Sequence, residues 1–388
     1  MADIVVIGAG VIGASIAANL ARLGERPLVL ERAHVCAGTT GQSGGVVRQH
    51  YSNPATAAMA RDALAVFRSW GDYYDGDPHF EAVGVLLTAG PQTEESLRTN
   101  VETHRKLGID TGLVSVDDIR KLDARINVDD CSALCLEPTA GIADTIATNH
   151  AFAETARNLG AIIEEGTAVT AIAVEGGRAT GVETSRGFVA ADVVVNSAGV
   201  WGPQLLRGLS PELPIGFSRH PMALVRRPPV DPVPHPVILD VHTDSYFLPK
   251  GDLSLIGKLG TMPEDSDIDP ESYERGVSND EIDRFLAAAG RRLPYLTRGS
   301  LLGGWAGIYD DSIDAHPVVD AVPGVEGLFC ALGMSGNCFK LSPVIGELLA
   351  RRIIQGDAAA PALDLFRYSR FLDGTTLSRT FSALSVMA

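Results

Sequence analysis

The first 31 residues alternate two apolar runs with closely spaced glycines. The first run, residues 3–7, is followed directly by three glycines in GxGxxG spacing: Gly8, Gly10 and Gly13. A helix-like segment comes next, and the second run, residues 27–30, ends at Glu31. The order strand, glycine turn, helix, strand and acid is the pattern of a dinucleotide-binding unit, and it is much more specific than the glycines alone.

Each part of this unit has a physical task. The first glycine permits a tight turn, the second lets backbone N–H groups approach a pyrophosphate, and the third lets the helix pack on the strand. The N-terminus of the helix faces the phosphate charge, and Glu31 is placed to accept hydrogen bonds from ribose hydroxyls. We therefore expect the following residues to contact a dinucleotide: Gly8, Gly10, Val11, Ile12, Gly13, Glu31 and Arg32.

The length and charge of the chain exclude several classes of protein. Its 388 residues are more than one ordinary domain holds and suit two domains. The net charge of −16 argues against binding to nucleic acid or to an anionic membrane, because both require basic surfaces. No run reaches about 18 apolar residues, so we expect no membrane-spanning helix. The start of the chain does not fit a signal peptide, and we expect a cytoplasmic protein.

The cysteines indicate reduced thiols rather than a metal site. They are five in number and include no CxxC pair: Cys36, Cys131, Cys135, Cys330 and Cys338. An odd number of cysteines without such a pair is typical of a cytoplasmic protein. Cys131 and Cys135 are close in sequence, but no histidine lies near enough to complete a zinc pattern, so we expect no bound metal.

Nucleotide-type elements occur at the start, in the middle and near the end of the chain, with sheet-rich segments between them. We therefore expect two interleaved domains rather than two consecutive ones. The nucleotide-binding domain is predicted from residues 1–80, 141–215 and 311–388. The substrate-binding domain is predicted from residues 81–140 and 216–310. Apolar periodicity predicts helices over residues 53–74, 93–107, 117–122, 146–159, 281–293 and 343–355, and a strand over residues 81–88.

The segment after Glu31 distinguishes between cofactors. A nicotinamide-dependent enzyme usually continues with strand, helix and strand, whereas this chain has a tract of glycine, serine and threonine at residues 37–45. Such a backbone is able to run close along an extended ligand, although alone it is also compatible with an ordinary mobile loop. Two more segments of small residues, 196–201 and 333–336, come after later strands. Three such contacts suit a long, buried cofactor, and FAD fits best.

The predicted fold class follows from this cofactor. It is α/β, with a Rossmann-like FAD-binding domain of the glutathione-reductase type interleaved with an α+β substrate domain on a mostly antiparallel sheet. Beyond the first glycine turn, we expect the FAD contacts to come from Thr39, Thr40, Gln42, Ser43, Gly44, Val169, Ala198, Gly199, Trp201, Gly333, Met334, Ser335, Gly336, Asn337, Phe339 and Lys340.

These segments together resemble the D-amino-acid-oxidase-like flavoproteins, and within them the sarcosine oxidase and glycine oxidase branch. The segment 333–343, GMSGNCFKLSP, carries the most specific part of the resemblance, which extends over nearly the whole chain. The resemblance implies FAD, an antiparallel sheet that covers the flavin, and oxidation of an amine next to a carboxylate.

The resemblance also implies roles for five residues. Arg48, in an R-x-x-Y segment, and Lys340 match positions that hold the substrate carboxylate. Lys258 matches the lysine above the flavin that promotes reaction with oxygen. The spacing between the preceding strand and this lysine is one residue longer here than in the family. Tyr246 and Tyr309 match active-site tyrosines.

Two departures from the family pattern bear on how the flavin is held. The family's SGHG sequence is Ser335-Gly336-Asn337-Cys338 here, so its histidine is missing. The cysteine that tethers FAD in monomeric sarcosine oxidases corresponds to Gly307, and we therefore expect noncovalent FAD. The alternative is a tether through Cys338.

Each of the five residues also has a purely structural interpretation. Arg48 is compatible with a salt bridge between the domains. Lys340 is compatible with a solvent-facing position at a helix start, although a cation there is disfavoured. Lys258 is compatible with a sheet lysine that points into water, and Tyr246 and Tyr309 with core aromatics.

The predicted reaction is oxidation of glycine or an N-substituted glycine. Hydride passes from the α-carbon of the neutral amine to flavin N5, water hydrolyses the imine to glyoxylate or another carbonyl product, and O2 reoxidises the flavin to give H2O2. The step needs no strong base, and neither His50 nor His316 is expected to act as one. Each is a candidate for a polar contact in the pocket, and each is equally compatible with a structural histidine.

Three other functions stay open at this point. They are a dehydrogenase that passes electrons to a quinone or a partner subunit, a 2-hydroxy-acid oxidoreductase, and a non-catalytic flavin-binding subunit. The sequence also leaves open the group on the substrate nitrogen, the pathway, and whether the chain forms a homo-oligomer.

Overall fold

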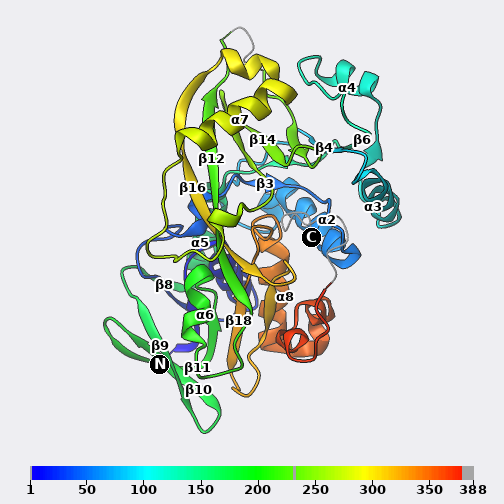
Figure 1. The fold of residues 1–388 in the computed structure, drawn as a ribbon. Helices are drawn as coiled ribbons and strands as arrows, with labels where there is room; N and C mark the ends of the chain where they lie inside the picture. The colour runs from blue at the N-terminus through cyan, green and yellow to red at the C-terminus, as the bar shows by residue number, and fades with distance from the viewer. Residues whose placement is uncertain (1, 230–232, 378–388) are drawn as a thin grey trace.

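The computed structural model describes residues 2–229 and 233–377, and most of the described strands form two large sheets (Figure 1). Each of these sheets has eight strands, and they occupy the lower and upper parts of the view in Figure 1. A separate antiparallel pair joins β3 (Val46–Val47) to β7 (Gly141–Ile142). The mixed α/β class predicted from the sequence is confirmed.

The first sheet is built around parallel strands. Its path is β17-β18-β11-β1-β2-β8, and all neighbours on it are parallel except β17 and β18. An antiparallel hairpin of β9 and β10 extends it from β11. The carboxyl ends of β1, β2, β11 and β18 therefore meet at one edge. The strands are β1 (Ala2–Ile7), β2 (Leu28–Leu30), β8 (Ile162–Glu164), β9 (Val169–Glu175), β10 (Arg178–Thr184), β11 (Gly187–Asn196), β17 (Val318–Ala321) and β18 (Leu328–Leu332).

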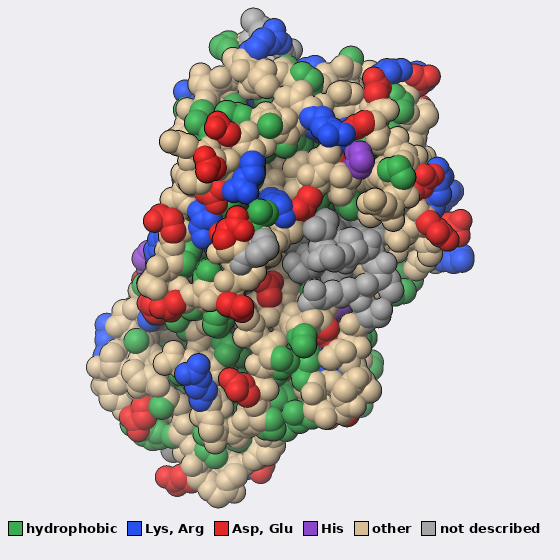
Figure 2. Space-filling model, in the orientation of Figure 1, with side chains coloured by type: hydrophobic (Ala, Val, Ile, Leu, Met, Phe, Trp, Pro, Cys, Tyr) green, Lys and Arg blue, Asp and Glu red, His purple; other side chains and the backbone are tan. Residues whose placement is uncertain are grey.

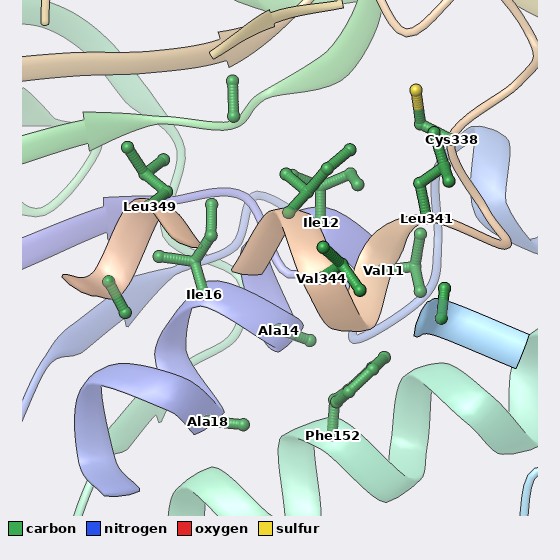
Figure 3. Packing of buried hydrophobic residues seen from close by; sticks show 14 of the residues in the cluster. Val11, Ile12, Ala14, Ile16, Ala18, Phe152, Cys338, Leu341, Val344 and Leu349 are labelled. Carbon is green, nitrogen blue, oxygen red and sulfur yellow. The ribbon is translucent and has the colours of Figure 1, made fainter. Parts of the chain in front are cut away.

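Helix α1 (Val11–Arg22) lies at the centre of the core that packs on this sheet. It is enclosed by α5 (Thr145–Asn158) and α8 (Ser342–Gln355), as Figure 3 shows. The close approach of α8 depends on Gly346, because a Cβ there would lie 2.2 Å from the Ser15 hydroxyl oxygen. A helix with apolar or small side chains on nearly every face is typical of a buried core element. Its buried apolar residues include Val11, Ile12, Ala14, Ile16 and Ala18.

The second sheet is mostly antiparallel, in the order β16-β12-β15-β14-β13-β4-β6-β5. Its neighbours pair antiparallel except for β13 and β4. Helix α7 (Asn279–Arg292) packs on β12, β14 and β15. The strands are β4 (Val85–Ala89), β5 (Gly112–Leu113), β6 (Ala133–Glu137), β12 (Ile215–Arg226), β13 (Val237–Asp240), β14 (Ser245–Lys250), β15 (Leu253–Lys258) and β16 (Ser300–Ser312).

The remaining helices connect and cover these sheets. They are α2 (Pro54–Arg68), α3 (Glu94–Lys106), α4 (Val116–Leu122) and α6 (Gly202–Leu205). Within the described ranges, no helix combines the length and apolar character that a membrane crossing requires. The face drawn in Figure 2 carries Lys and Arg side chains interspersed with Asp and Glu.

Two differences from the predicted elements have local causes. The predicted strand over 81–88 begins only at Val85, because Gly84 has a φ of +81° and interrupts the extended chain. The long strand β16 was not predicted. Its sequence, SLLGGWAGIYDDS, has three glycines and ends in acidic residues, so it lacks the alternation that marks a strand.

The two sheets draw their strands from different parts of the chain. Strands of the first sheet lie within residues 2–30, 162–196 and 318–332. Strands of the second sheet lie within residues 85–137 and 215–312. The sheets are therefore interleaved in sequence, while the boundaries of the two domains stay a prediction.

Candidate active site

Glycine turns from separate strands meet at the carboxyl edge of the first sheet. Gly8, directly after β1, has a φ of +94°, which favours glycine. A Cβ on Gly8 would lie 2.9 Å from the carbonyl oxygen of Ser197, which follows β11. A Cβ on Gly13 would lie 2.0 Å from the carbonyl oxygen of Gly8. The backbones are therefore packed too closely for side chains, as the GxGxxG spacing predicts.

Glu31 lies beside this turn, at the end of β2, and is 9% exposed. Its Oε2 accepts a hydrogen bond from the N–H of Ala9, and its Oε1 accepts one from the N–H of Ala33, both at 2.9 Å. Two backbone donors thus fix the carboxylate at the place where this motif binds ribose hydroxyls.

The tract of small residues is anchored to the glycine turn. Thr39–Gln42 form a short 3-10 helix, and Thr40 Oγ1 accepts a hydrogen bond of 3.0 Å from the N–H of Val11 at the start of α1. The carbonyl of Gln42 accepts one of 3.1 Å from Trp305 Nε1 on β16. The tract therefore connects a helix N-terminus, which attracts phosphate, to the second sheet.

Arg32 and Trp201, both predicted to contact the cofactor, lie against each other. The Arg32 Cζ lies 3.7 Å from the centroid of the indole ring. Glu271 accepts from both side chains, at 3.0 Å from Arg32 Nη1 and 2.5 Å from Trp201 Nε1. Glu271 lies in the connection between β15 and α7, and sequence reasoning missed it because no motif surrounds it.

The structure gives Val169 and Ser335 packing roles. Val169 packs against the apolar cluster of the first sheet. Ser335 is fully buried with a φ of +49°, and its Oγ donates to the carbonyl of Gly333 and accepts from the N–H of Ser312, both at 3.1 Å. Their direct contact with the cofactor stays a prediction.

The groups at this edge fit a dinucleotide such as FAD. The turn Gly8–Gly13 excludes side chains next to the first turn of a 12-residue helix, and Glu31 supplies a fixed carboxylate. These residues suit the adenosine and pyrophosphate part of the cofactor. The tract Thr39–Gly44 continues from there toward a cavity at the second sheet, where the flavin would be held.

The cavity brings together all five residues predicted for substrate binding and catalysis: Arg48, Lys340, Lys258, Tyr246 and Tyr309. Predicted cofactor contacts lie in the same wall: Thr39, Gln42, Ser43, Gly44, Gly336, Asn337 and Phe339. The rest of the wall is largely apolar and includes Met222, Leu239, Leu248, Leu259 and Ile308. His50 and His316, the predicted polar contacts, are buried elsewhere and do not line the cavity.

Arg48 and Lys340 both lie against Tyr51. Lys340 Nζ donates to the Tyr51 hydroxyl at 3.2 Å and to the carbonyl of Asn337 at 2.8 Å. The Arg48 Cζ lies 4.4 Å from the centroid of the Tyr51 ring, and its guanidinium donates to the carbonyl of His50 and to Asn337 Oδ1. Lys340 is 5% exposed, so the solvent-facing interpretation is wrong. Burial, together with the charge of Arg48, holds the Lys340 pKa well below its usual range.

Three buried groups lie near Arg48, and sequence reasoning missed two of them, Glu137 and His104. The ligand atoms of Glu137, His50 and His104 all lie within 4.8 Å of one another. Glu137 Oε2 accepts a hydrogen bond of 2.9 Å from the N–H of Gln49, and burial raises the pKa of this carboxyl to about 7. The sequence signal that could have pointed to Glu137 is its position as the acidic last residue of an otherwise apolar strand, β6.

The charge of Arg48 acts on this cluster. It lowers the pKa of both imidazoles, after the larger effect of their burial. The same positive field opposes a metal cation at this place. The expectation that the chain binds no metal stays a prediction.

Lys258, at the end of β15, lies in the cavity wall and forms an ion pair with Asp244. Its Nζ also donates to the carbonyl of Gly260 at 3.3 Å. The side chains of Lys258 and Asp244 are 30% and 32% exposed. Sequence reasoning missed Asp244, which is brought to Lys258 by strand pairing.

The two tyrosines of the cavity pack closely against glycines. A Cβ on Gly257 would lie 2.3 Å from the Tyr246 hydroxyl oxygen, and a Cβ on Gly336 would lie 2.2 Å from Tyr309 Cε2. His220 stacks on Tyr309 with ring centroids 3.7 Å apart. Burial raises the pKa of Tyr309 to about 12 and lowers that of His220 to about 3.

Among the described residues that line the cavity, none is a cysteine, and Gly307 lies in its wall. Cys338, the alternative tether, is 3% exposed, and its Sγ lies 3.3 Å from the carbonyl oxygen of Met334. Burial raises the pKa of this thiol far above its ordinary value, which disfavours the reactive thiolate. Noncovalent FAD stays a prediction that this arrangement favours.

Comparisons with known proteins agree with this geometry. The chain is 27% identical over 370 residues to the sarcosine oxidase subunit beta of Arthrobacter sp, and the match covers 92% of this chain and 88% of that protein. It is 26% identical over 374 residues to the glycine oxidase of Pseudomonas putida, with 95% and 98% covered. The crystal structure of L-proline dehydrogenase from P. horikoshii has the same fold, with a TM-score of 0.87 at 23% identity, and the match covers 96% of this chain and 98% of that chain.

A model of the FAD dependent oxidoreductase family matches residues 3–352, which is most of the chain. Together with the relatives, this match confirms the predicted resemblance, the FAD cofactor and the oxidoreductase class. The chain belongs to the family of FAD-dependent oxidoreductases.

Proposed function

We propose that the protein oxidises glycine or an N-substituted glycine, with O2 as the electron acceptor. The observation that carries this proposal is the pair of buried cations, Arg48 and Lys340, in the wall of a cavity that also adjoins the predicted cofactor tract. The names of the curated relatives, sarcosine oxidase subunit beta and glycine oxidase, support the substrate class.

The two cations suit a carboxylate. Arg48 offers a planar fork of donors, and Lys340 offers a point charge whose hydrogen-bond partners, the Tyr51 hydroxyl and the Asn337 carbonyl, are uncharged. Each charge-assisted hydrogen bond to a substrate carboxylate would contribute about 1.5–3 kcal/mol. Carboxylate binding also favours the protonated form of Lys340, because it opposes the effects of burial and of the Arg48 charge, which lower the Lys340 pKa.

The remaining wall orients the amine and excludes water. Met222, Leu239 and Leu248 surround the space with hydrocarbon, which accommodates the α-carbon and an N-substituent. The substrate loses a hydride from its α-carbon and a proton from its nitrogen, and water hydrolyses the released imine to glyoxylate or another carbonyl compound. Bound FAD supplies the hydride acceptor. The side chains of the cavity hold the reacting groups in position, and no strong base is needed.

Lys258 is the residue that we assign to the reaction with oxygen. O2 takes two electrons and two protons from the reduced holoenzyme and becomes H2O2. Negative charge develops on oxygen in this reaction, so a cation in the cavity wall lowers its barrier.

A dehydrogenase is the second candidate function, because the cation of Lys258 is paired with Asp244. The L-proline dehydrogenase of P. horikoshii shares the fold, although its identity of 23% supports the fold alone. In a dehydrogenase, a quinone or a partner protein would replace O2 as the electron acceptor.

The test is anaerobic mixing of the purified holoenzyme with a panel of substrates, followed by air. The panel contains glycine, sarcosine, longer N-alkylglycines, proline and 2-hydroxy acids, and flavin absorbance is recorded. Bleaching by an N-substituted glycine and fast recovery in air is the expected result. Bleaching without recovery would identify a dehydrogenase. Bleaching by 2-hydroxy acids alone, or by nothing in the panel, would overturn the proposal.

A further inference from the structure

We propose that Asp244 restrains the reaction of the reduced holoenzyme with O2 by neutralising Lys258. The inference rests on the role proposed above for Lys258, and it adds Asp244, to which the sequence resemblance assigned no role. It predicts that the oxidase activity of this chain is set by a carboxylate and an ammonium together, rather than by the lysine alone.

The pair is built into the sheet. Lys258 is the register partner of Ser245, so Asp244 lies next to Lys258 where β14 begins. Asp244 Oδ1 accepts a hydrogen bond of 2.7 Å from the N–H of Gly260, and its other oxygen, Oδ2, forms the ion pair. Gly260 also accepts from Lys258 Nζ at 3.3 Å, so one backbone segment anchors both partners.

The other titratable groups beside Lys258 add little charge. Burial and the charges of Lys258 and Arg219 keep His220 neutral, with a pKa of about 3. Tyr246 and Tyr309 are also uncharged, since burial raises the pKa of each phenol.

Arg219 itself is neutralised by two acids. Its Nη1 lies 2.8 Å from Asp265 Oδ1 and 2.5 Å from Glu281 Oε1. One arginine and two carboxylates together carry a formal charge of −1, so this group adds no positive charge to that of the Lys258–Asp244 pair, which sums to zero.

A neutral pair stabilises developing negative charge much less than a lone ammonium does. Removing the carboxylate charge leaves Lys258 uncompensated in the wall. For a unit charge acting over several ångströms at the edge of a cavity, this corresponds to a rate increase of about tenfold. The same change in charge strengthens binding of a small anion such as sulfite to the oxidised holoenzyme, which gives a readout that is independent of turnover.

Asp244→Asn is the principal variant. Asp244 has a φ of +55°, a conformation that asparagine tolerates well, and the amide oxygen keeps the bond from Gly260 N–H. Asp244→Gly, which also accepts positive φ, repeats the test if the first variant does not hold flavin. Asp252→Asn is the matched control, because Asp252 is exposed in the turn between β14 and β15 and pairs with Arg226.

The holoenzymes are reduced with dithionite and mixed with O2 in a stopped-flow instrument, and sulfite affinity is measured separately by flavin absorbance. We expect Asp244→Asn to raise the second-order rate constant for reoxidation about tenfold and to tighten sulfite binding by a similar factor. We expect Lys258→Met to lower both quantities and Asp252→Asn to change neither. Chemical reduction makes the result independent of the substrate.

Two outcomes would overturn the inference. If Lys258→Met lowers the reoxidation rate but Asp244→Asn leaves the rate and the sulfite affinity unchanged or lowers them, Asp244 is not a restraint, while the role of Lys258 stands. If Lys258→Met leaves the reoxidation rate unchanged, the oxygen part of the proposed function fails together with this inference.

Discussion

The ammonium of Lys340 lies 3.2 Å from the hydroxyl of Tyr51, and the two residues are 289 positions apart in the chain. The same hydroxyl donates to the carbonyl of Asn337 at 2.9 Å, and the Cζ of Arg48 lies 4.4 Å from the centroid of the ring. Tyr51 thus holds two basic side chains in one cavity wall, where burial and the charge of Arg48 oppose protonation of the lysine.

Replacement of Lys340 with Met is expected to weaken carboxylate binding. The loss of one charge-assisted hydrogen bond would raise the dissociation constant roughly tenfold to a hundredfold, with a smaller effect on the rate of flavin reduction at saturating substrate. Anaerobic titration of flavin absorbance with an unreactive carboxylate measures this affinity.

The matched control for this variant is Lys250→Met, because Lys250 is exposed at the end of β14 and does not line the cavity. Its affinity should equal that of the wild type. An unchanged affinity in Lys340→Met would show that Lys340 does not hold the carboxylate.

Tyr51→Phe is expected to destabilise the folded chain while keeping the ring that packs against Arg48. The carbonyl of Asn337 and the ammonium of Lys340 each lose a buried partner, which costs about 1–3 kcal/mol in the free energy of unfolding. Urea unfolding of both proteins measures this difference. Tyr73→Phe, at a side chain that is 40% exposed, serves as the control and should unfold like the wild type. A Tyr51→Phe profile equal to that of the control would contradict the anchoring role.

The nucleotide half of the site was predictable because its signal is local. Gly8, Gly10 and Gly13 lie within six residues, and Glu31 follows one helix later, so the short-range spacing already specifies the turn and the acid. The anchoring of the tract through Thr40 and Val11 was not predicted, since a hydroxyl bond across 29 residues leaves no mark in the sequence.

The substrate half was predictable only in part. Arg48 and Lys340 came from the resemblance to known flavoproteins, and their burial depends on strands and loops that are distant in sequence. Asp244 escaped notice because its pairing with Lys258 depends on the register of β14 and β15, while Glu137 ends an apolar strand and only the fold shows that it is buried. Contacts of this kind are set by tertiary packing, which periodicity and composition do not encode.

Gly13→Ala is expected to abolish FAD binding. The new methyl group would lie 2.0 Å from the carbonyl oxygen of Gly8 and 2.8 Å from Ser197 Oγ, so the turn has to open. The measurement is the flavin-to-protein absorbance ratio after reconstitution with excess FAD, with circular dichroism to verify the fold. Gly71→Ala is the control, because nothing lies within 4 Å of a Cβ at that position. Full flavin content in Gly13→Ala would refute the assignment of this turn to the cofactor.

The raised pKa of Glu137 leads us to expect that the stability of the folded chain depends on pH. Burial raises the pKa of its carboxyl from 4.5 to about 7, so between these pH values the folded chain keeps a proton that the unfolded chain releases. The unfolded state therefore binds fewer protons in this range, and the free energy of unfolding falls as the pH rises through it. For a shift of this size, the loss between about pH 4.5 and about pH 7 is on the order of 3 kcal/mol.

Glu137→Gln removes this titration while Gln49 N–H keeps an acceptor. The difference in the free energy of unfolding between the variant and the wild type, measured in urea at about pH 5 and at about pH 8, should shift in favour of the variant at the higher pH. Asp310, whose pKa burial also raises to about 7, titrates in both proteins and cancels in the difference. Glu326→Gln, at an exposed acid paired with Arg178, should show no such shift. Parallel pH profiles for Glu137→Gln and the wild type would mean that this carboxyl is already ionised at low pH, as expected if the charge of Arg48 outweighs the effect of burial.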